Sequence, residues 1–387
     1  MNNWNEYKLG DICFFGKDKS EVSTLTNDNY ISTENMIPNR GGITKATTLP
    51  TGDFTPSFEN DDTLVSNIRP YFKKIWKASF PGGCSADVLV FKANEKVSKD
   101  YLYYILSDDE FFKYSMTTSK GTKMPRGDKV AIMNYPVHLP NIETQKKIAH
   151  FLSLLDEKIS LNNRINDNLE QQAQAIFKSW FVDFEPFGGK MPDDWKIGKL
   201  SEIADYLNGL AMQKFRPAEN EEALSVLKIK ELRQGICDDS SELCSPNKIK
   251  PKFIINDGDV IFSWSGSLLV DIWCGGKCGL NQHLFKVTSK NYDKWYYYLW
   301  TKHHLDRFIF LAADKATTMG HIKREELDKA EVVIPSESDM KKIGSVLQPI
   351  IDMIINNKIE NIRLSKIRDE LLPQLMNGSL SVDEVVL

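Results

Sequence analysis

The chain has 387 residues, of which 41% are hydrophobic and 26% are charged, and its formal net charge is −4. The length allows two or three globular domains, while the lack of any apolar run near about 18 residues excludes a membrane span. The N-terminus also lacks the basic and then apolar pattern of a signal peptide, so we expect a cytoplasmic protein. The slight acidity does not exclude nucleic-acid binding, because a basic patch can lie on one face of an acidic protein.

Residues 1–140, which we call the first head, predict a compact domain of mixed α and β structure. Short strand-like runs such as Thr63–Val65 and Val88–Phe91 alternate with glycine-containing turns, and Tyr101–Leu106 is typical of an aromatic helix.

Residues 141–185 predict a long helix. Asn141 is a good N-cap, and no Pro or Gly interrupts this segment. Its apolar residues recur in steps of three and four, with Asn162 on the same seam, which favours a coiled coil whose register a buried polar residue helps to fix. The apolar stripe comprises Ile148, Leu152, Leu155, Ile159, Ile165, Leu169, Ala173, Ile176 and Trp180.

Residues 190–378 then repeat this organisation. Residues 190–335 predict a second head, residues 336–378 predict a second helix that begins at Ser336, and residues 379–387 form a tail. Pro349 interrupts the second apolar stripe, so a kink or a break into two helices is expected there.

The repeat is a duplicated domain with an offset between 191 residues, from Trp4 to Trp195, and 197 residues, from Asp62 to Asp259. Two equivalent helices of about 38 residues, each about 57 Å long, pair most simply as an antiparallel coiled coil. We therefore expect an α+β protein in which two similar mixed α/β heads are separated by two long helices with pseudo-two-fold symmetry.

Several motifs resemble the specificity subunit of type I restriction-modification systems. The strings Ser179–Phe184 and Leu371–Gly378, together with Leu139-Pro140 followed by Gln145–Ile148, look like the helical regions of that family. The opening Trp4-x2-Tyr7-Lys8-Leu9-Gly10-Asp11-Ile12 looks like the start of its target recognition domains.

The resemblance implies a subunit without catalytic activity whose two heads each read one half of a split, asymmetric DNA target. The coiled coil would set the spacing between the halves and dock two methyltransferase subunits. It implies no cofactor on this chain, because S-adenosylmethionine is expected on the methyltransferase. Motor-nuclease subunits would join the full complex.

Candidate DNA-binding residues lie in two stretches of each head, where Lys, Arg, Thr and Ser occur beside glycine or at a strand end. Ordinary solvated loops and a turn after a strand are the alternative interpretations. In the first head the candidates are Ser66, Asn67, Arg69, Lys73, Lys120, Thr122, Lys123, Arg126 and Lys129. In the second head they are Ser263, Ser265, Lys315, Thr317, Thr318, His321, Lys323 and Arg324.

No catalytic or metal site is predicted. The chain has neither an Asn-Pro-Pro-Tyr motif for amino methylation nor a complete phosphate-binding loop, and Cys274-x3-Cys278 with His283 lacks the second ligand pair of a zinc site. Two other functions stay open: a two-headed interaction scaffold without DNA contact, and a recognition module of a fused methyltransferase-nuclease.

Overall fold

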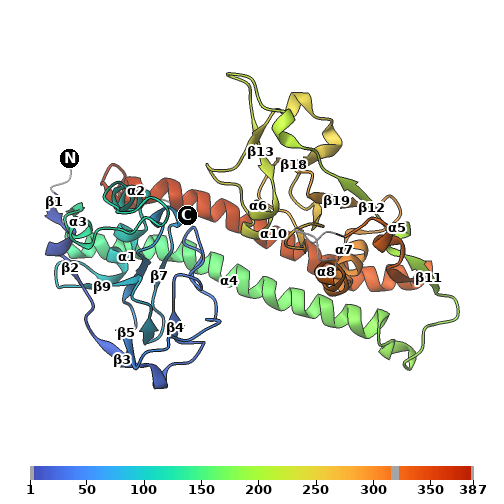
Figure 1. Cartoon of the computed structure of the whole chain (residues 1–387), viewed down its shortest axis with the longest axis horizontal. Coiled ribbons are helices and arrows are strands. Elements are labelled where there is room, and N and C mark those ends of the chain that lie inside the picture. Colours follow the sequence, from blue (N-terminus) through green and yellow to red (C-terminus); the bar gives the residue numbers. More distant parts are fainter. Residues whose placement is uncertain (1–3, 315–321, 385–387) are drawn as a thin grey trace. The chain divides into compact units, whose positions relative to one another are not determined.

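The computed structural model describes residues 4–314 and 322–384. The chain divides into two compact units, one formed by Met1–Glu157 with Ser365–Leu387 and the other by Lys158–Leu364. Figure 1 labels helices and strands of both units.

The first unit is built around an antiparallel four-stranded sheet in the order β2-β9-β6-β7. A second four-stranded sheet has the order β3-β5-β8-β4, and β1 pairs with β10. The strands are β1 (Asn5–Lys8), β2 (Cys13–Phe15), β3 (Lys19–Glu21), β4 (Tyr30–Ile31), β5 (Phe54–Phe58), β6 (Thr63–Ser66), β7 (Ile75–Lys77), β8 (Gly82–Cys84), β9 (Val88–Ala93) and β10 (Pro136–Leu139).

Side chains cap the first three α-helices of the first unit by accepting hydrogen bonds from free backbone N–H groups. Asp108 caps α2, and Asp128 accepts hydrogen bonds from Val130 and Ala131 at the start of α3. The helices are α1 (Lys99–Ser107), α2 (Asp109–Thr117), α3 (Lys129–Met133), the start of α4 (Ile142–Phe181), the end of α10 (Glu337–Met376), and the 3-10 helices η1 (Leu9–Asp11), η2 (Val22–Thr24), η3 (Pro70–Phe72) and η8 (Val382–Glu384).

The second unit repeats the central sheet with the strand order β12-β19-β16-β17. Its other four-stranded sheet has the order β14-β13-β18-β15, and β11 pairs with β20. The strands are β11 (Lys196–Lys199), β12 (Asp205–Asn208), β13 (Leu224–Leu227), β14 (Leu243–Cys244), β15 (Ile254–Ile255), β16 (Val260–Ser263), β17 (Leu269–Ile272), β18 (Cys278–Leu280), β19 (Leu284–Thr288) and β20 (Glu331–Ile334).

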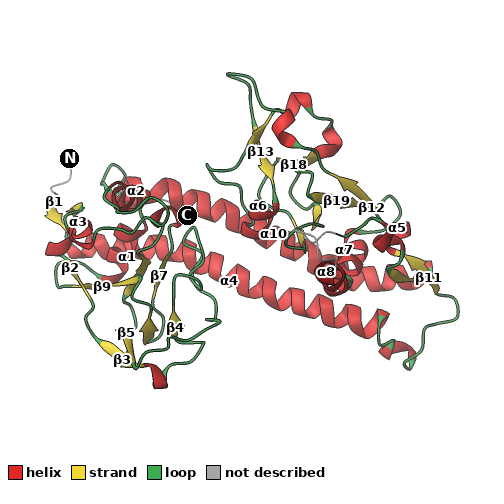
Figure 2. Cartoon of the chain, viewed as in Figure 1, coloured by secondary structure: helices red, strands yellow, loops and turns green. Residues whose placement is uncertain are grey.

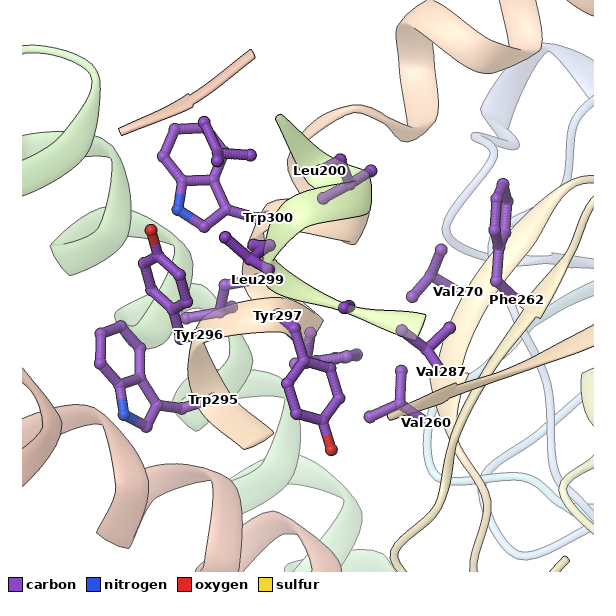
Figure 3. Close-up of a cluster of buried hydrophobic side chains, with 14 of the residues drawn as sticks. Leu200, Val260, Phe262, Val270, Val287, Trp295, Tyr296, Tyr297, Leu299 and Trp300 are labelled. Carbon is purple, nitrogen blue, oxygen red and sulfur yellow. The ribbon is translucent and has the colours of Figure 1, made fainter. Parts of the chain in front are cut away.

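An aromatic core holds the second unit together. Figure 3 shows side chains of α7, among them Trp295 and Trp300, in one buried cluster with Val260 and Val287 of the central sheet. The helices of this unit are α5 (Leu200–Ile203), α6 (Ile229–Gln234), α7 (Lys294–His303), α8 (Leu305–Asp314), α9 (Glu325–Asp328), the rest of α4 and α10, and the 3-10 helices η4 (Glu185–Phe187), η5 (Met212–Lys214), η6 (Pro246–Lys248) and η7 (Pro251–Phe253).

A repeated aspartate shows how closely the two units follow the same plan. Asp62 accepts a 2.8 Å hydrogen bond from the backbone N–H of Glu59 and pairs with Lys92 of β9 at 2.9 Å. Asp259 does the same with the N–H of Asn256 at 2.8 Å and with Lys286 of β19 at 2.6 Å. The carboxylate thus closes the turn before β6 or β16 and ties it to the neighbouring strand.

The second sheets differ at one edge. In both units a central strand, β8 or β18, has one parallel and one antiparallel neighbour. The fourth strand, however, joins the antiparallel neighbour in the first unit, as β3 on β5, and the parallel neighbour in the second, as β14 on β13. Figure 2 labels β3 and β5 of the first unit and β13 and β18 of the second among the strands. The second sheets therefore agree in three of their strands and differ in where the fourth strand is placed.

The two long helices pair antiparallel within each unit. In the second unit the Asn162 amide donates to Glu360 at 2.7 Å and to Asn361 at 2.9 Å, and Asn357 donates to Asn166 at 2.9 Å. Asn162 is only 1% exposed, which confirms the predicted buried polar residue on the seam. In the first unit Arg368 donates to Asp156 at 2.7 Å.

The helix starts predicted at Asn141 and Ser336 are confirmed. Asn141 accepts a 2.9 Å hydrogen bond from the N–H of Thr144, and Ser336 accepts one of 3.4 Å from the N–H of Asp339. Of the two outcomes expected at Pro349, the break into two helices is wrong, because α10 runs from Glu337 to Met376 as one helix, whereas the kink stays a prediction. Pro349 lies on the exposed side, where water can hydrate the carbonyl that loses its helical partner.

Among the described residues, no helix is long and apolar enough to cross a membrane.

Candidate nucleic-acid interface

Two chain segments of the first unit leave the central sheet side by side. Ser66 of β6 pairs in register with Val88 of β9, and the N–H of Asn67 then donates to the carbonyl of Asp87 at 2.8 Å. Beyond this point the segments diverge, so the end of the sheet presents the β6–β7 loop and the turn that precedes β9.

The loop after α2 joins them at the same end. The N–H of Arg69 donates to the carbonyl of Pro125 at 2.8 Å, and the N–H of Gly127 donates to the carbonyl of Asn67 at 3.1 Å. The two stretches that the sequence singled out separately in the first head are therefore hydrogen-bonded neighbours. Gly127 must be small, because a Cβ there would lie 2.8 Å from the Asn67 Oδ1.

The tip of this loop is cationic and exposed. Lys120 pairs with Asp128 at 2.6 Å, and Arg126 pairs with Asp87 at 3.1 Å. Thr122, Lys123 and Lys129 are also exposed, and the ion pairs of the described residues include neither of these two lysines. Exposed cations beside small residues suit contact with phosphates and base edges.

The candidates at the strand end are less accessible. Ser66 is 4% exposed and its hydroxyl donates to the carbonyl of Ile68 at 3.1 Å, which stabilises the turn. Asn67 is 7% exposed, and its buried Oδ1 has no hydrogen-bond partner. Arg69 is half-buried with a left-handed backbone, φ 51°, and its Nε also lacks a partner.

Lys73 connects the β6–β7 loop to α2. Its ammonium pairs with Asp109 at 2.8 Å, and the same carboxylate receives the guanidinium of Arg40. Burial alone would raise the pKa of Asp109, but the hydrogen bonds and charges of Lys73 and Arg40 bring that pKa below its ordinary value. Lys73 is thus partly neutralised within the unit.

The second unit repeats this convergence. Ser263 of β16 pairs in register with Leu284 of β19, and the N–H of Ile322 donates to the carbonyl of Trp264 at 3.2 Å. The loop before α9 therefore meets the end of β16, as its counterpart meets the end of β6.

The described candidates of the second unit divide between buried serines and exposed cations. Ser263 is fully buried and its hydroxyl donates to the carbonyl of Ser267 at 2.8 Å, whereas Ser265 shares a 3.0 Å hydrogen bond with Nδ1 of His283. Lys323 and Arg324 are exposed just before α9. The candidates Lys315, Thr317, Thr318 and His321 lie outside the described residues.

The structure adds two residues that sequence reasoning missed, Asp87 and His283. Each stands directly before the first residue of a strand, β9 or β19, and contacts the candidate loops. Both residues stand directly before equivalent strands, and this equivalence could have identified them. They were missed because an aspartate in one copy and a histidine in the other do not look like a matching pair.

The described residues of the candidate loops are not arranged as a metal centre. Over residues 4–314 and 322–384, no group of three or more His, Cys, Asp or Glu side chains could hold a metal ion. The chemistry available at these loops is hydrogen bonding and charge pairing.

Comparison with known proteins identifies the duplicated unit. The family model described as the type I restriction modification DNA specificity domain matches residues 1–171 and again residues 192–364. The two matched segments follow the duplication seen in the sequence.

Individual relatives agree over most of the chain. The MjaIX specificity subunit of Methanocaldococcus jannaschii is 29% identical, over 75% of this chain and 71% of its own length. The HindI specificity subunit of Haemophilus influenzae is 24% identical, over 98% of this chain and 100% of its own.

A solved structure supports the fold. The S subunit of a type I restriction-modification system from M. genitalium superposes with a TM-score of 0.55 at 14% identity, over 97% of this chain and 96% of that one. With both halves of the chain matched by the same family model, the protein belongs to the type I restriction-modification DNA specificity family.

Proposed function

We propose that this chain is the non-catalytic subunit that selects the DNA target of a type I restriction-modification complex, and that each unit reads one half of a bipartite, asymmetric sequence. The relatives named above are specificity subunits of type I restriction enzymes. Because the candidate loops differ in sequence between the two units, the two half-sites differ as well.

One structural observation carries this proposal. In both units the loop before a short helix, α3 or α9, is hydrogen-bonded to the residue that follows a central strand, β6 or β16. The same end of the same sheet thus presents exposed cations twice in one chain. A scaffold without DNA contact has no need to repeat this arrangement.

The long helices provide the second part of the function. Both α4 and α10 have 40 residues and pair antiparallel through Asn162 and Asn166 in the second unit and through Asp156 in the first. We propose that they set the distance between the half-sites and dock two methyltransferase subunits. S-adenosylmethionine then belongs to those partners, and motor-nuclease subunits join the full complex.

A binding competition tests the proposal. The chain, assembled with its methyltransferase subunits, is mixed with labelled genomic fragments and with random duplex as competitor, and retained fragments are sequenced. We expect enrichment of one bipartite sequence. Retention without any sequence preference, or no retention at all, would overturn the proposal, and the second result would support the scaffold alternative.

The non-catalytic role has its own test. The purified chain alone is incubated with duplex DNA and labelled S-adenosylmethionine, and the complex with methyltransferase subunits serves as the positive control. We expect methyl transfer only with the complex. Transfer by the chain alone would favour the fused-enzyme alternative.

A further inference from the structure

Asp87 and His283 occupy the same position in the two units. The central strands pair as Ser66 with Val88 in the first unit and as Ser263 with Leu284 in the second. The residue before each of these partners is therefore Asp87 or His283, and each stands beside the residue that leaves β6 or β16. At this one position the duplicated chain carries an anion in one copy and an imidazole in the other.

The Asp87 carboxylate holds an arginine whose backbone is itself fixed. Arg126 Nη2 lies 3.1 Å from Oδ1 and 3.2 Å from Oδ2 of Asp87. The main chain of Arg126 exchanges hydrogen bonds of 2.9 Å and 3.0 Å with Lys120 and bridges to Ile68. Asp87 is held as well, because its carbonyl accepts from Asn67 at 2.8 Å.

This ion pair is too exposed to solvent to contribute much to the stability of the fold. The side chains of Asp87 and Arg126 are 34% and 57% exposed, and ion pairs this exposed contribute little to the free energy of folding. Its larger effect is to confine a flexible side chain at an exposed loop, which lowers the entropy that a bound partner must remove. A guanidinium held by one carboxylate still has free N–H donors for a second acceptor.

The second unit has an imidazole at the same position, with a hydroxyl and an amide beside it. Nδ1 of His283 shares a 3.0 Å hydrogen bond with the Ser265 hydroxyl, and Nε2 lies 3.3 Å from the Gln282 amide. The backbone N–H of His283 donates to Asn281 at 3.2 Å. The imidazole and the two side chains that it contacts, a hydroxyl and an amide, bring hydrogen-bond donors and acceptors together at one half-buried strand end.

We propose that this position determines specificity in each unit, so that the residue before β9 or β19 governs recognition of one base pair in its half-site. Asp87 is a positioning residue that aims Arg126 at a guanine, whose O6 and N7 accept two hydrogen bonds from a guanidinium. His283, with Ser265, makes the corresponding contact in the second half-site. This inference rests on the proposed function.

The test maps methylated sites in DNA exposed to the chain with its methyltransferase subunits. Three variants are compared with the wild type: Asp87→Asn, Arg126→Gln and the double variant. Arg126→Gln should reduce selectivity at one G·C pair of the first half-site about tenfold or more. Asp87→Asn should cause a smaller loss at the same base pair, and the double variant should be no worse than Arg126→Gln alone.

Control variants separate positioning from folding. Asp28→Asn removes a comparable exposed ion pair of the first unit, with Lys45 at 2.8 Å, and should leave both half-sites unchanged. Asp87→Glu keeps the charge and should restore selectivity toward the wild-type value. His283→Asn should alter selectivity in the second half-site alone.

The possible outcomes distinguish a failure of this inference from a failure of the proposed function. Unchanged selectivity in Asp87→Asn or in His283→Asn, losses that add in the double variant, or an effect in the wrong half-site would each overturn the inference. A wild-type complex without any sequence preference would instead overturn the proposed function on which it rests.

Discussion

His304 gives the second unit a definable sensitivity to acid. Its ring lies against Trp300 and Phe308, with centroid distances of 5.9 Å and 6.0 Å, and its Nε2 contacts the carbonyl of Glu331 at 2.8 Å. The pKa of this imidazole falls from 6.5 to about 4, chiefly because the ring is buried; the hydrogen bond to Glu331 opposes this fall, and the neighbouring charges of His303 and Arg307 make smaller contributions to it.

We predict that the free energy of unfolding decreases, because of His304, as the pH falls from about 6.5 to about 4. In that interval the unfolded chain binds the proton and the folded chain does not, so its contribution is complete above the unfolded pKa and is lost toward the folded one. His304→Gln should show a shallower fall in the free energy of unfolding across this interval. Equal slopes for variant and wild type would contradict the assignment.

Phe181 carries much of the contact between α4 and the core of the second unit. It is 1% exposed, and its ring stacks on Phe177 with a centroid distance of 5.1 Å and lies 5.7 Å from that of Trp195. Phe181→Ala should lower the free energy of unfolding by about 3–5 kcal/mol, because it opens a cavity among rings. Val182→Ala, at a 38% exposed neighbour, is the matched control and should change it little.

At the residue scale, the sequence could identify cationic loop tips but not their neighbours. Lys120 and Arg126 stood out because a loop rich in Lys and Arg recurs at the equivalent place in the second copy. Asp87 was missed because its partnership with Arg126 depends on the register of β6 with β9, which joins residues 39 positions apart. Pairing across a sheet is not contained in any local pattern.

Among the elements, α4 and α10 were the most predictable. Apolar steps of three and four residues, together with caps at Asn141 and Ser336, are local signals, and each helix begins where they predicted. The break expected at Pro349 was wrong because the cost of a proline in a helix depends on its surroundings. Exposure to water, which the stripe alone did not reveal, lets the helix continue.

Arg368 is a charged residue at a buried position of α10 in the first unit, where an apolar side chain would be expected. It is 8% exposed and donates to Asp156 of α4 at 2.7 Å, and Asp156 also accepts a 2.8 Å hydrogen bond from the Tyr104 hydroxyl. Burial alone would lower the pKa of Arg368, but the carboxylates of Asp156 and Asp369 raise it, so the guanidinium stays charged.

We expect Arg368→Met to destabilise the first unit by about 2–4 kcal/mol. This is near the lower end of the cost of leaving a buried charge unpaired, because Asp156 is 26% exposed. Arg368→Met with Asp156→Asn should recover part of the loss, since the remaining amide is neutral and can still accept from Tyr104. Thermal and chemical unfolding of the three variants measure the difference. A double variant less stable than Arg368→Met would show that the charge is not the cause.

For the whole molecule, duplication was the feature that the sequence revealed most fully. Offsets of 191 to 197 residues predicted two similar units, and the central sheets indeed share one strand order. The differing edge strands β3 and β14 were not predictable, because both lie in segments where the two copies have no matching motif. These edge strands belong to the parts of the chain in which the two units differ.

The chain divides into its two units after Glu157 in α4 and after Leu364 in α10. Deleting residues 157–163 together with residues 360–366 removes about two turns, or about 10 Å, from each helix. The deletion spares both the Asp156–Arg368 pair and the Asn166–Asn357 pair. We predict an unchanged pair of half-sites with a shorter spacer, by at most about three base pairs, as read by mapping methylated sites. An unchanged spacer would refute the role of the helices as a ruler.

Mapping every methylated site produced by the unaltered chain with its methyltransferase subunits is the strongest test of the proposed function. We expect one target with two different half-sites separated by a spacer of constant length and free sequence. A palindromic target, a single uninterrupted sequence or methylation without sequence preference would contradict it.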